Sequence, residues 1–160
     1  FRMAFQVIKI KNTKMLNKII SDIKKAKKSK EITNVKAKIT DWNSLLKKNS
    51  IKYFLNKYLA NYFIYEIWGN IYKQKDYVVE HDHVNTSAHM YFDTCGVLFL
   101  TNTKTPLNFT SMLKKHFGKK GDLLLFKPNE LHSVDKVIDK ERITLSFNGR
   151  MKEEYEKEKN

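Results

Sequence analysis

Two apolar strands near the C-terminus, each next to a residue that can bind a ligand, constrain this chain more than any other feature. A Gly-Asp turn leads into the apolar run 123–126, which is typical of a buried strand, and the segment 127–129 ends that strand before His132. A second strand is predicted at 142–147. The side chains on one face of this strand are Arg142, Thr144 and Ser146. We expect these two strands to present an imidazole and a guanidinium to one cavity.

His81 and His83 are the upstream residues that could complete such a site. These residues are two apart, so on a strand both imidazoles point to the same side. With His132 they form a set of three protein ligands with open coordination positions, as in catalytic metal centres. Imidazoles suit iron, zinc, copper or nickel and do not choose among them. Asp82 points to the opposite face of a regular strand, and becomes an alternative ligand if the strand bulges there.

Arg142 carries a planar, permanently charged fork that matches a carboxylate. Thr144, on the same strand face, can add a hydroxyl to that anion site. The alternative is a surface arginine that pairs with Glu141 or Asp139. The sequence leaves both interpretations open.

The first third of the chain is predicted to be mostly helical. A short strand at 1–10 precedes a helix at 14–28, whose apolar residues recur at helical spacing with lysines opposite. A second helical region begins at Asp41 or Ser44 and continues to residue 62. The lysines between 24 and 30 are interpreted as an exposed helix end.

The rest of the chain predicts a mainly β (α+β) fold, a jelly-roll sandwich or barrel behind the N-terminal helical layer. The predicted strands are 64–73, 77–83, 88–92, 97–101, 123–126, 132–137 and 142–147. A turn is expected at 93–96 and a basic loop at 114–121, while 107–113 is ambiguous. We expect one domain with three parts: 1–62 as a basic support region, 63–150 as the core, and 151–160 as a charged tail.

The net charge of +14 is concentrated in one region, because residues 9–57 contain fifteen lysines and three acidic residues. Nucleic acid or an acidic partner could use this surface, and a solvated lysine-rich helix face is the alternative. The chain has no run of eighteen apolar residues, so we expect no membrane span. The single cysteine, Cys95, suits a reducing cytoplasm.

Two blocks of the sequence resemble the 2-oxoglutarate- and Fe(II)-dependent oxygenases, and specifically a small branch common in phages and marine bacteria. The matching segments are Trp68-Gly69-Asn70-Ile71, Asp76-Tyr77, His81-Asp82-His83-Val84-Asn85, Gly121-Asp122, Phe126, Pro128, Leu131-His132 and Arg142-Ile143-Thr144-Leu145-Ser146-Phe147-Asn148. They follow the family's order and cover about residues 66–148. Residues 1–60 carry no such signal.

The resemblance implies a double-stranded β-helix with N-terminal supporting helices. It assigns the metal to His81, His83 and His132, and the distal carboxylate of 2-oxoglutarate to Arg142 and Thr144. Further candidates for the cavity wall, and so for cosubstrate binding, are Asn70 and Tyr91. The implied cofactors are Fe(II) and 2-oxoglutarate, and the implied reaction decarboxylates 2-oxoglutarate to succinate while it hydroxylates an unidentified substrate.

The chain departs from the family pattern in two places. The wider superfamily has H-x-D/E where this chain has His81-Asp82-His83, and the branch has Ser-Gly-Val-Tyr-Tyr where this chain has Ala-His-Met-Tyr-Phe at 88–92. Two rival functions therefore stay open. One is a three-histidine, cupin-like metalloenzyme that does not use 2-oxoglutarate. The other is a non-catalytic basic β-domain that binds nucleic acid or an acidic partner.

Overall fold

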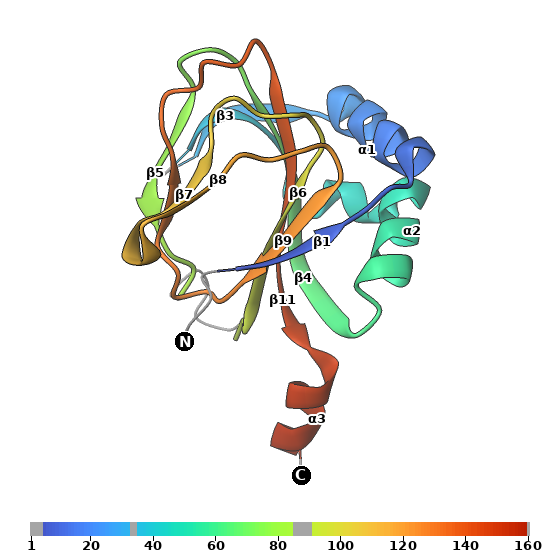
Figure 1. The fold of residues 1–160 in the computed structure, drawn as a ribbon. Coiled ribbons are helices and arrows are strands. Elements are labelled where there is room, and N and C mark those ends of the chain that lie inside the picture. The colour runs from blue at the N-terminus through green and yellow to red at the C-terminus, as the bar shows by residue number, and fades with distance from the viewer. Residues whose placement is uncertain (1–4, 33–34, 85–90, 160) are drawn as a thin grey trace.

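The computed structural model describes residues 5–32, 35–84 and 91–159, which form one strongly curled antiparallel sheet with helices on its outer side (Figure 1). The strand order is β1-β9-β6-β11-β4-β3-β5-β10-β7-β8, and β2 pairs with β3. The prediction of a mainly β fold with N-terminal helices is confirmed. The boundaries proposed between support region, core and tail stay predictions.

The strands are β1 (Gln6–Lys9), β2 (Lys28–Ile32), β3 (Val35–Thr40), β4 (Tyr62–Tyr72), β5 (Tyr77–His81), β6 (Thr94–Phe99), β7 (Leu107–Phe109), β8 (Lys114–His116), β9 (Asp122–Phe126), β10 (His132–Val134) and β11 (Arg142–Met151). The helices are α1 (Thr13–Lys25), α2 (Asn49–Tyr58) and α3 (Lys152–Lys159), with 3-10 turns at Ser44–Lys47 and Thr110–Met112. No helix in these described ranges is both long and apolar enough to cross a membrane.

Alternation along β11 separates a helix-facing core from the inside of the curl. Ile143, Leu145 and Phe147 are buried in a cluster that includes Ile19 and Ile23 of α1. The residues between them face the inside, as the period of two requires. A second cluster of buried apolar residues draws on other strands, among them β6, β7 and β9. One strand therefore supplies the core on one side and a candidate site on the other.

Helix α1 begins where the sequence predicted, but it ends earlier. The Asn12 side chain accepts a hydrogen bond from the Met15 backbone N–H and caps its N-terminus. The helix ends at Lys25, and Lys28 begins β2 instead of extending the helix. The Lys28 ammonium donates to the carbonyls of Lys24 and Ala26, which satisfies the last turn of the helix. The interpretation of 24–30 as a helix end is therefore wrong beyond Lys25.

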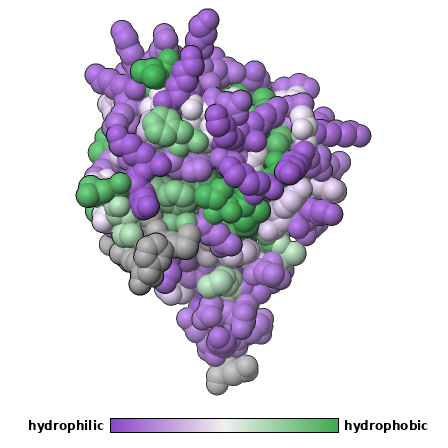
Figure 2. Space-filling model, in the orientation of Figure 1, coloured by the Kyte–Doolittle hydropathy of each residue, from purple (hydrophilic) through white to green (hydrophobic). Residues whose placement is uncertain are grey.

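The lysine-rich helices lie outside the curl. α1 and α2 cover the sheet on the side away from its interior (Figure 1). Figure 2 shows a mostly hydrophilic surface in the same orientation, with hydrophobic side chains gathered in the middle of the face. Binding of nucleic acid or an acidic partner to the basic region stays a prediction, and such binding would use a surface distinct from the interior of the curl.

The predicted turn at 93–96 is wrong, because Thr94, Cys95 and Gly96 belong to β6, between β9 and β11. Gly96 fits there because the Phe147 ring lies directly over it, where a Cβ atom would overlap the ring. Residues 88–90 of the strand predicted at 88–92 lie outside the described residues, and the remaining two are not in a strand. The expected basic loop at 114–121 contains the short strand β8, and the tail forms α3.

Asp122 fastens β1 and the β8–β9 connection to the sheet. Its buried carboxylate accepts hydrogen bonds from the Lys9 ammonium at 2.6 Å, the His116 imidazole at 2.9 Å and the Lys119 backbone N–H at 2.9 Å. Burial by itself raises the pKa of this carboxyl, but the hydrogen bonds outweigh burial and the net pKa lies below its ordinary value of 3.8. Asp122 therefore stabilises the fold in its ionised form.

Replacement of Asp122 with asparagine is expected to lower the free energy of unfolding by about 1–3 kcal/mol at pH 7, because three donors lose a charged acceptor that is itself buried. Since the folded pKa is depressed, this contribution is complete above the unfolded value of 3.8 and is lost as the pH falls through the folded value. Urea denaturation from pH 3 to 7 measures both effects. The exposed Asp135→Asn variant is the control, and an equal loss at pH 3 and pH 7 would contradict the charge argument.

Candidate active site

The pairing of β4 with β11 builds the polar wall of the site. Each inward residue of β11 lies opposite an inward residue of β4. The register pairs are Arg142 with Tyr72, Thr144 with Asn70, Ser146 with Trp68, and Asn148 with Glu66. Side chains directly opposite each other on one sheet face are within contact distance. The wall therefore consists of four cross-strand pairs.

The structure brings the three predicted histidines together. His81 and His132 are register partners in the β5–β10 ladder. His83 lies just beyond the end of β5, and its backbone N–H donates to the Pro128 carbonyl at 2.8 Å. The strand predicted to reach residue 83 therefore ends two residues earlier, but the imidazole still reaches the site. One ligand atom from each histidine lies within 4.8 Å of the others.

Backbone carbonyls orient two of the three imidazoles. The Nδ1 atom of His81 is 2.8 Å from the Val79 carbonyl oxygen, and that of His132 is 2.8 Å from the Glu130 carbonyl oxygen. A carbonyl can only accept, so each Nδ1 carries the hydrogen and each Nε2 carries the lone pair. These Nε2 atoms are thus in the state that binds a metal ion.

Burial keeps His83 and His132 neutral. It lowers the pKa of His132 to about 3, helped by the neighbouring His81 and His83, and lowers the pKa of His83 to about 4. Neutral imidazole is the form that ligates metals. Three imidazoles with their ligand atoms close together fit a first-row transition metal ion.

Asp82 is placed away from this set. Its side chain is exposed, and its carboxylate accepts a hydrogen bond from the Val84 backbone N–H at 3.3 Å. Within the described part of the chain, the cluster of possible metal ligands contains the three histidines and not Asp82.

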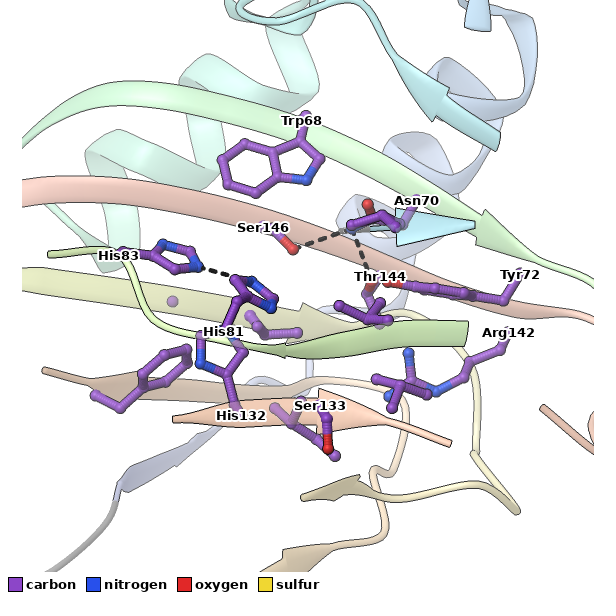
Figure 3. Close-up of a pocket in the computed structure, with 17 residues that line it drawn as sticks. Trp68, Asn70, Tyr72, His81, His83, His132, Ser133, Arg142, Thr144 and Ser146 are labelled. Carbon is purple, nitrogen blue, oxygen red and sulfur yellow. Dashed lines mark hydrogen bonds between the residues drawn. The ribbon is translucent and has the colours of Figure 1, made fainter. Parts of the chain in front are cut away.

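Arg142 is buried at the other end of the same pocket (Figure 3). Its side chain is 1% exposed, its Nε donates to the Thr105 carbonyl at 3.3 Å, and its Nη2 has no hydrogen-bond partner among the described residues. The guanidinium lies 5.0 Å from the centroid of the Tyr72 ring. Burial lowers the pKa of Arg142, and Tyr72 and Asp139 oppose this effect. The guanidinium of arginine nevertheless stays charged.

The alternative of a surface arginine paired with Glu141 or Asp139 is wrong. Glu141 forms ion pairs with Lys24 at 3.2 Å and Lys73 at 2.7 Å. Asp139 accepts hydrogen bonds from the backbone N–H groups of Lys104 and Thr105. Neither acid supplies the acceptor that a buried, charged fork requires.

Asn70 organises the hydroxyl groups between the two ends of the pocket. Its side-chain amide donates to Thr144 Oγ1 at 3.0 Å and to Ser146 Oγ at 3.0 Å. Thr144 and Asn70 are both buried and line the pocket. The hydroxyl and amide groups can therefore extend an anion site that starts at Arg142.

Trp68 forms the wall beside His83, with the two ring centroids 6.5 Å apart. Trp42 stacks on its outer face at 5.1 Å, nearly parallel, and is 46% exposed. Tyr91, predicted for the cavity wall, is placed elsewhere. It is 60% exposed, its ring lies 4.7 Å from the Arg150 guanidinium, and it lines a separate surface hollow.

The pocket that joins these groups contains about 510 Å³ of space between protein atoms, including its opening to solvent. Figure 3 shows the imidazoles at one end, Arg142 at the other, and the Asn70 hydrogen bonds between them. The pocket therefore combines three possible metal ligands at one end with a buried guanidinium at the other.

Sequence reasoning missed three functional candidates on the same walls: Glu66, Tyr72 and Asn148. The period of two on β4 could have found the first two, since they share a face with Asn70. Asn148 shares the face of Arg142 and Thr144 in the same way. The missing information was that both faces turn inward and that β4 pairs with β11.

Comparisons with known proteins support this fold. No protein-family model and no curated protein sequence matches the chain. Among solved structures, a viral collagen prolyl hydroxylase from Paramecium bursaria Chlorella virus-1, in complex with 2-oxoglutarate, is 17% identical. The match covers 92% of this chain and 96% of that one, with a TM-score of 0.69. A Pseudomonas putida prolyl-4-hydroxylase is 13% identical over 92% of both chains, with a TM-score of 0.72.

HygX from Streptomyces hygroscopicus, with nickel and 2-oxoglutarate bound, is 11% identical over 91% of this chain and 82% of that one, with a TM-score of 0.71. These identities are low, so the likeness concerns the fold. The chain has the double-stranded β-helix fold of the 2-oxoglutarate- and Fe(II)-dependent oxygenases.

Proposed function

We propose that this chain is an Fe(II)- and 2-oxoglutarate-dependent dioxygenase that hydroxylates a substrate while it converts 2-oxoglutarate to succinate. The observation that carries the proposal is the buried guanidinium of Arg142, whose Nη2 lacks an acceptor in the described structure. It lines the same pocket as three imidazoles that could hold a metal ion. A buried charge without a partner is costly unless a ligand supplies the counter-charge. A dicarboxylate that also reaches the metal meets that requirement.

His81, His83 and His132 would hold the iron, and Arg142 would bind the distal carboxylate of 2-oxoglutarate with Thr144 beside it. The chemistry that iron and 2-oxoglutarate supply when bound is oxygen activation coupled to decarboxylation. The task of the protein side chains is to orient the cosubstrate and to exclude water from one face of the pocket. The apolar lining, including Val97, Leu107 and Phe126, supplies that exclusion.

The test is an anaerobic titration of the apo-protein with Fe(II) and then with 2-oxoglutarate. We expect Fe(II) to bind and 2-oxoglutarate to add a visible metal-to-ligand charge-transfer band, because the three imidazoles and Arg142 line one pocket. Succinate should form when oxygen is admitted. Metal binding without the band, and without succinate, would overturn the proposal.

A three-histidine, cupin-like metalloenzyme that does not use 2-oxoglutarate is the second candidate. The third imidazole at position 83 favours it, since it replaces a carboxylate and leaves the metal site more cationic. Under this function the metal binds, but no property of the metal site depends on Arg142. The same titration therefore separates the two functions.

A further inference from the structure

His83 differs from the other two histidines in what orients it. Its Nδ1 faces two side chains, Asn148 Oδ1 at 2.6 Å and Cys95 Sγ at 3.4 Å. An amide can turn to present either oxygen or NH2, and a thiol can donate. The position of the proton on His83 therefore depends on what holds Asn148 in place.

Glu66 holds it. The Asn148 side-chain NH2 donates to Glu66 Oε2 at 2.9 Å, across the β4–β11 ladder. Burial raises the pKa of Glu66 above its ordinary value of 4.5, and the hydrogen bond from Asn148 opposes this effect. In its ionised form the carboxylate can only accept, so it keeps the NH2 on its own side and turns Oδ1 toward His83. That oxygen accepts, which places the proton on His83 Nδ1 and the lone pair on Nε2. All three side chains are at most 8% exposed, so water competes little.

A second contact favours the opposite tautomer. His83 Nε2 is 3.2 Å from His81 Nε2. In a neutral His81 ring whose Nδ1–H donates to the Val79 carbonyl oxygen, Nε2 is an acceptor. Before metal binds, a proton on His83 Nε2 would form a hydrogen bond with that acceptor. The metal-free site thus favours a form of His83 that cannot ligate, unless Glu66 and Asn148 oppose it.

We propose that Glu66, acting through Asn148, is a positioning residue that keeps His83 in the Nδ1–H tautomer and so makes a third imidazole usable as a metal ligand. The inference rests on the metal site of the proposed function and deepens it. It assigns to this chain a carboxylate that acts on the metal indirectly, through an amide and an imidazole.

The first test is Glu66→Gln, which keeps the shape but adds a donor. The new amide can donate to Asn148 Oδ1, so the Asn148 amide can turn its NH2 toward His83. Nitrogen NMR of the ¹⁵N-histidine-labelled apo-protein at pH 8 should then show His83 changing from Nδ1–H to Nε2–H. The affinity for Ni(II), measured by calorimetry, should fall about 10- to 100-fold.

The second test is rescue by Asn148→Asp in the Glu66→Gln background. A carboxylate at position 148 can accept from His83 Nδ1 and from the new glutamine at the same time. The Nδ1–H tautomer and most of the Ni(II) affinity should therefore return. A purely structural role of Glu66 would not be reversed by a second substitution. Glu80→Gln, which alters an exposed glutamate bonded to Thr110, is the matched control and should change neither readout.

An unchanged His83 tautomer with unchanged Ni(II) affinity in Glu66→Gln would overturn the inference, and so would a double variant that recovers neither. The tautomer is read without metal or cosubstrate. Absence of 2-oxoglutarate binding in the unsubstituted protein would therefore overturn the proposed function alone, while the positioning role would still be decided by the NMR result.

Discussion

Arg142→Met is expected to weaken 2-oxoglutarate binding by about 100-fold or more, because charge-assisted hydrogen bonds to a carboxylate contribute about 1.5–3 kcal/mol each. The affinity for metal should stay the same, since Arg142 lies at the opposite end of the pocket from the imidazoles. The charge-transfer titration measures the first quantity and calorimetry with Ni(II) measures the second. Methionine retains most of the side-chain volume, so the cavity walls stay supported.

The same substitution should raise the stability of the apo-protein, which is the opposite of the usual effect of replacing a buried residue. The guanidinium is 1% exposed and has an unpartnered Nη2 in the described structure, so its removal relieves a desolvation cost. Urea denaturation without ligand measures this gain. 2-Oxoglutarate should then stabilise the unsubstituted protein but not the variant.

Two further variants define what the guanidinium does. Arg142→Lys keeps the charge but loses the planar fork, so we expect an intermediate affinity. Arg150→Met is the matched control, because Arg150 is also buried but pairs with Glu158 on α3 and does not line the pocket. If Arg142→Met bound 2-oxoglutarate as well as the unsubstituted protein, the dicarboxylate site would be wrong and the three-histidine alternative would gain support.

Strand periodicity predicted the parts of the fold that hold the core. In β11 the alternation of Ile143, Leu145 and Phe147 with polar residues is complete. The strand begins at Arg142 as the pattern predicted, and it extends beyond the predicted end to Met151. The continuous apolar run of β9 was equally informative because β9 lies between β1 and β6 and is buried on both faces. Buried strands can be predicted in this way because burial restricts their residues to apolar types.

The sequence predictions fail where the residue types are determined by something other than the burial of that strand. β3 alternates Val35, Ala37 and Ile39 with lysines, but the surrounding lysine excess obscured this period. Gly96 reads as a turn residue, yet it is required in β6 by a ring packed across the sheet. That contact joins residues distant in sequence, so no local pattern encodes it.

The candidate site was predictable in its chemistry but not in its connections. Imidazole and guanidinium are distinctive groups, so His81, His132 and Arg142 stand out in the sequence. Glu66 and Asn148 are not distinctive in the sequence, and the contact between them depends on the register of β4 against β11. Their hydrogen bond to each other, and that from His83 to Asn148, exist only once distant strands have paired.

His132→Ala is expected to abolish high-affinity metal binding, with a loss larger than the roughly 100-fold typical of groups that only orient a ligand. Three imidazoles are the complete cluster of possible ligands in the described chain, and removal of one leaves a pair. His132 is also held in place, since it is 6% exposed and its Nδ1 is 2.8 Å from the Glu130 carbonyl oxygen. Two imidazole ligands alone do not fix the coordination geometry of the ion.

Thermal unfolding with increasing Ni(II) is the measurement, because an ion that binds only the folded state raises the melting temperature with concentration. The unsubstituted protein should show this rise and His132→Ala should not. His116→Gln is the matched control: it replaces a histidine that is bonded to Asp122 and lies outside the cluster, so the apo-protein is weakened but the nickel-dependent rise persists. A rise of equal size in His132→Ala would show that nickel binds elsewhere, and the three-histidine site would have to be abandoned together with both enzymatic functions that depend on it.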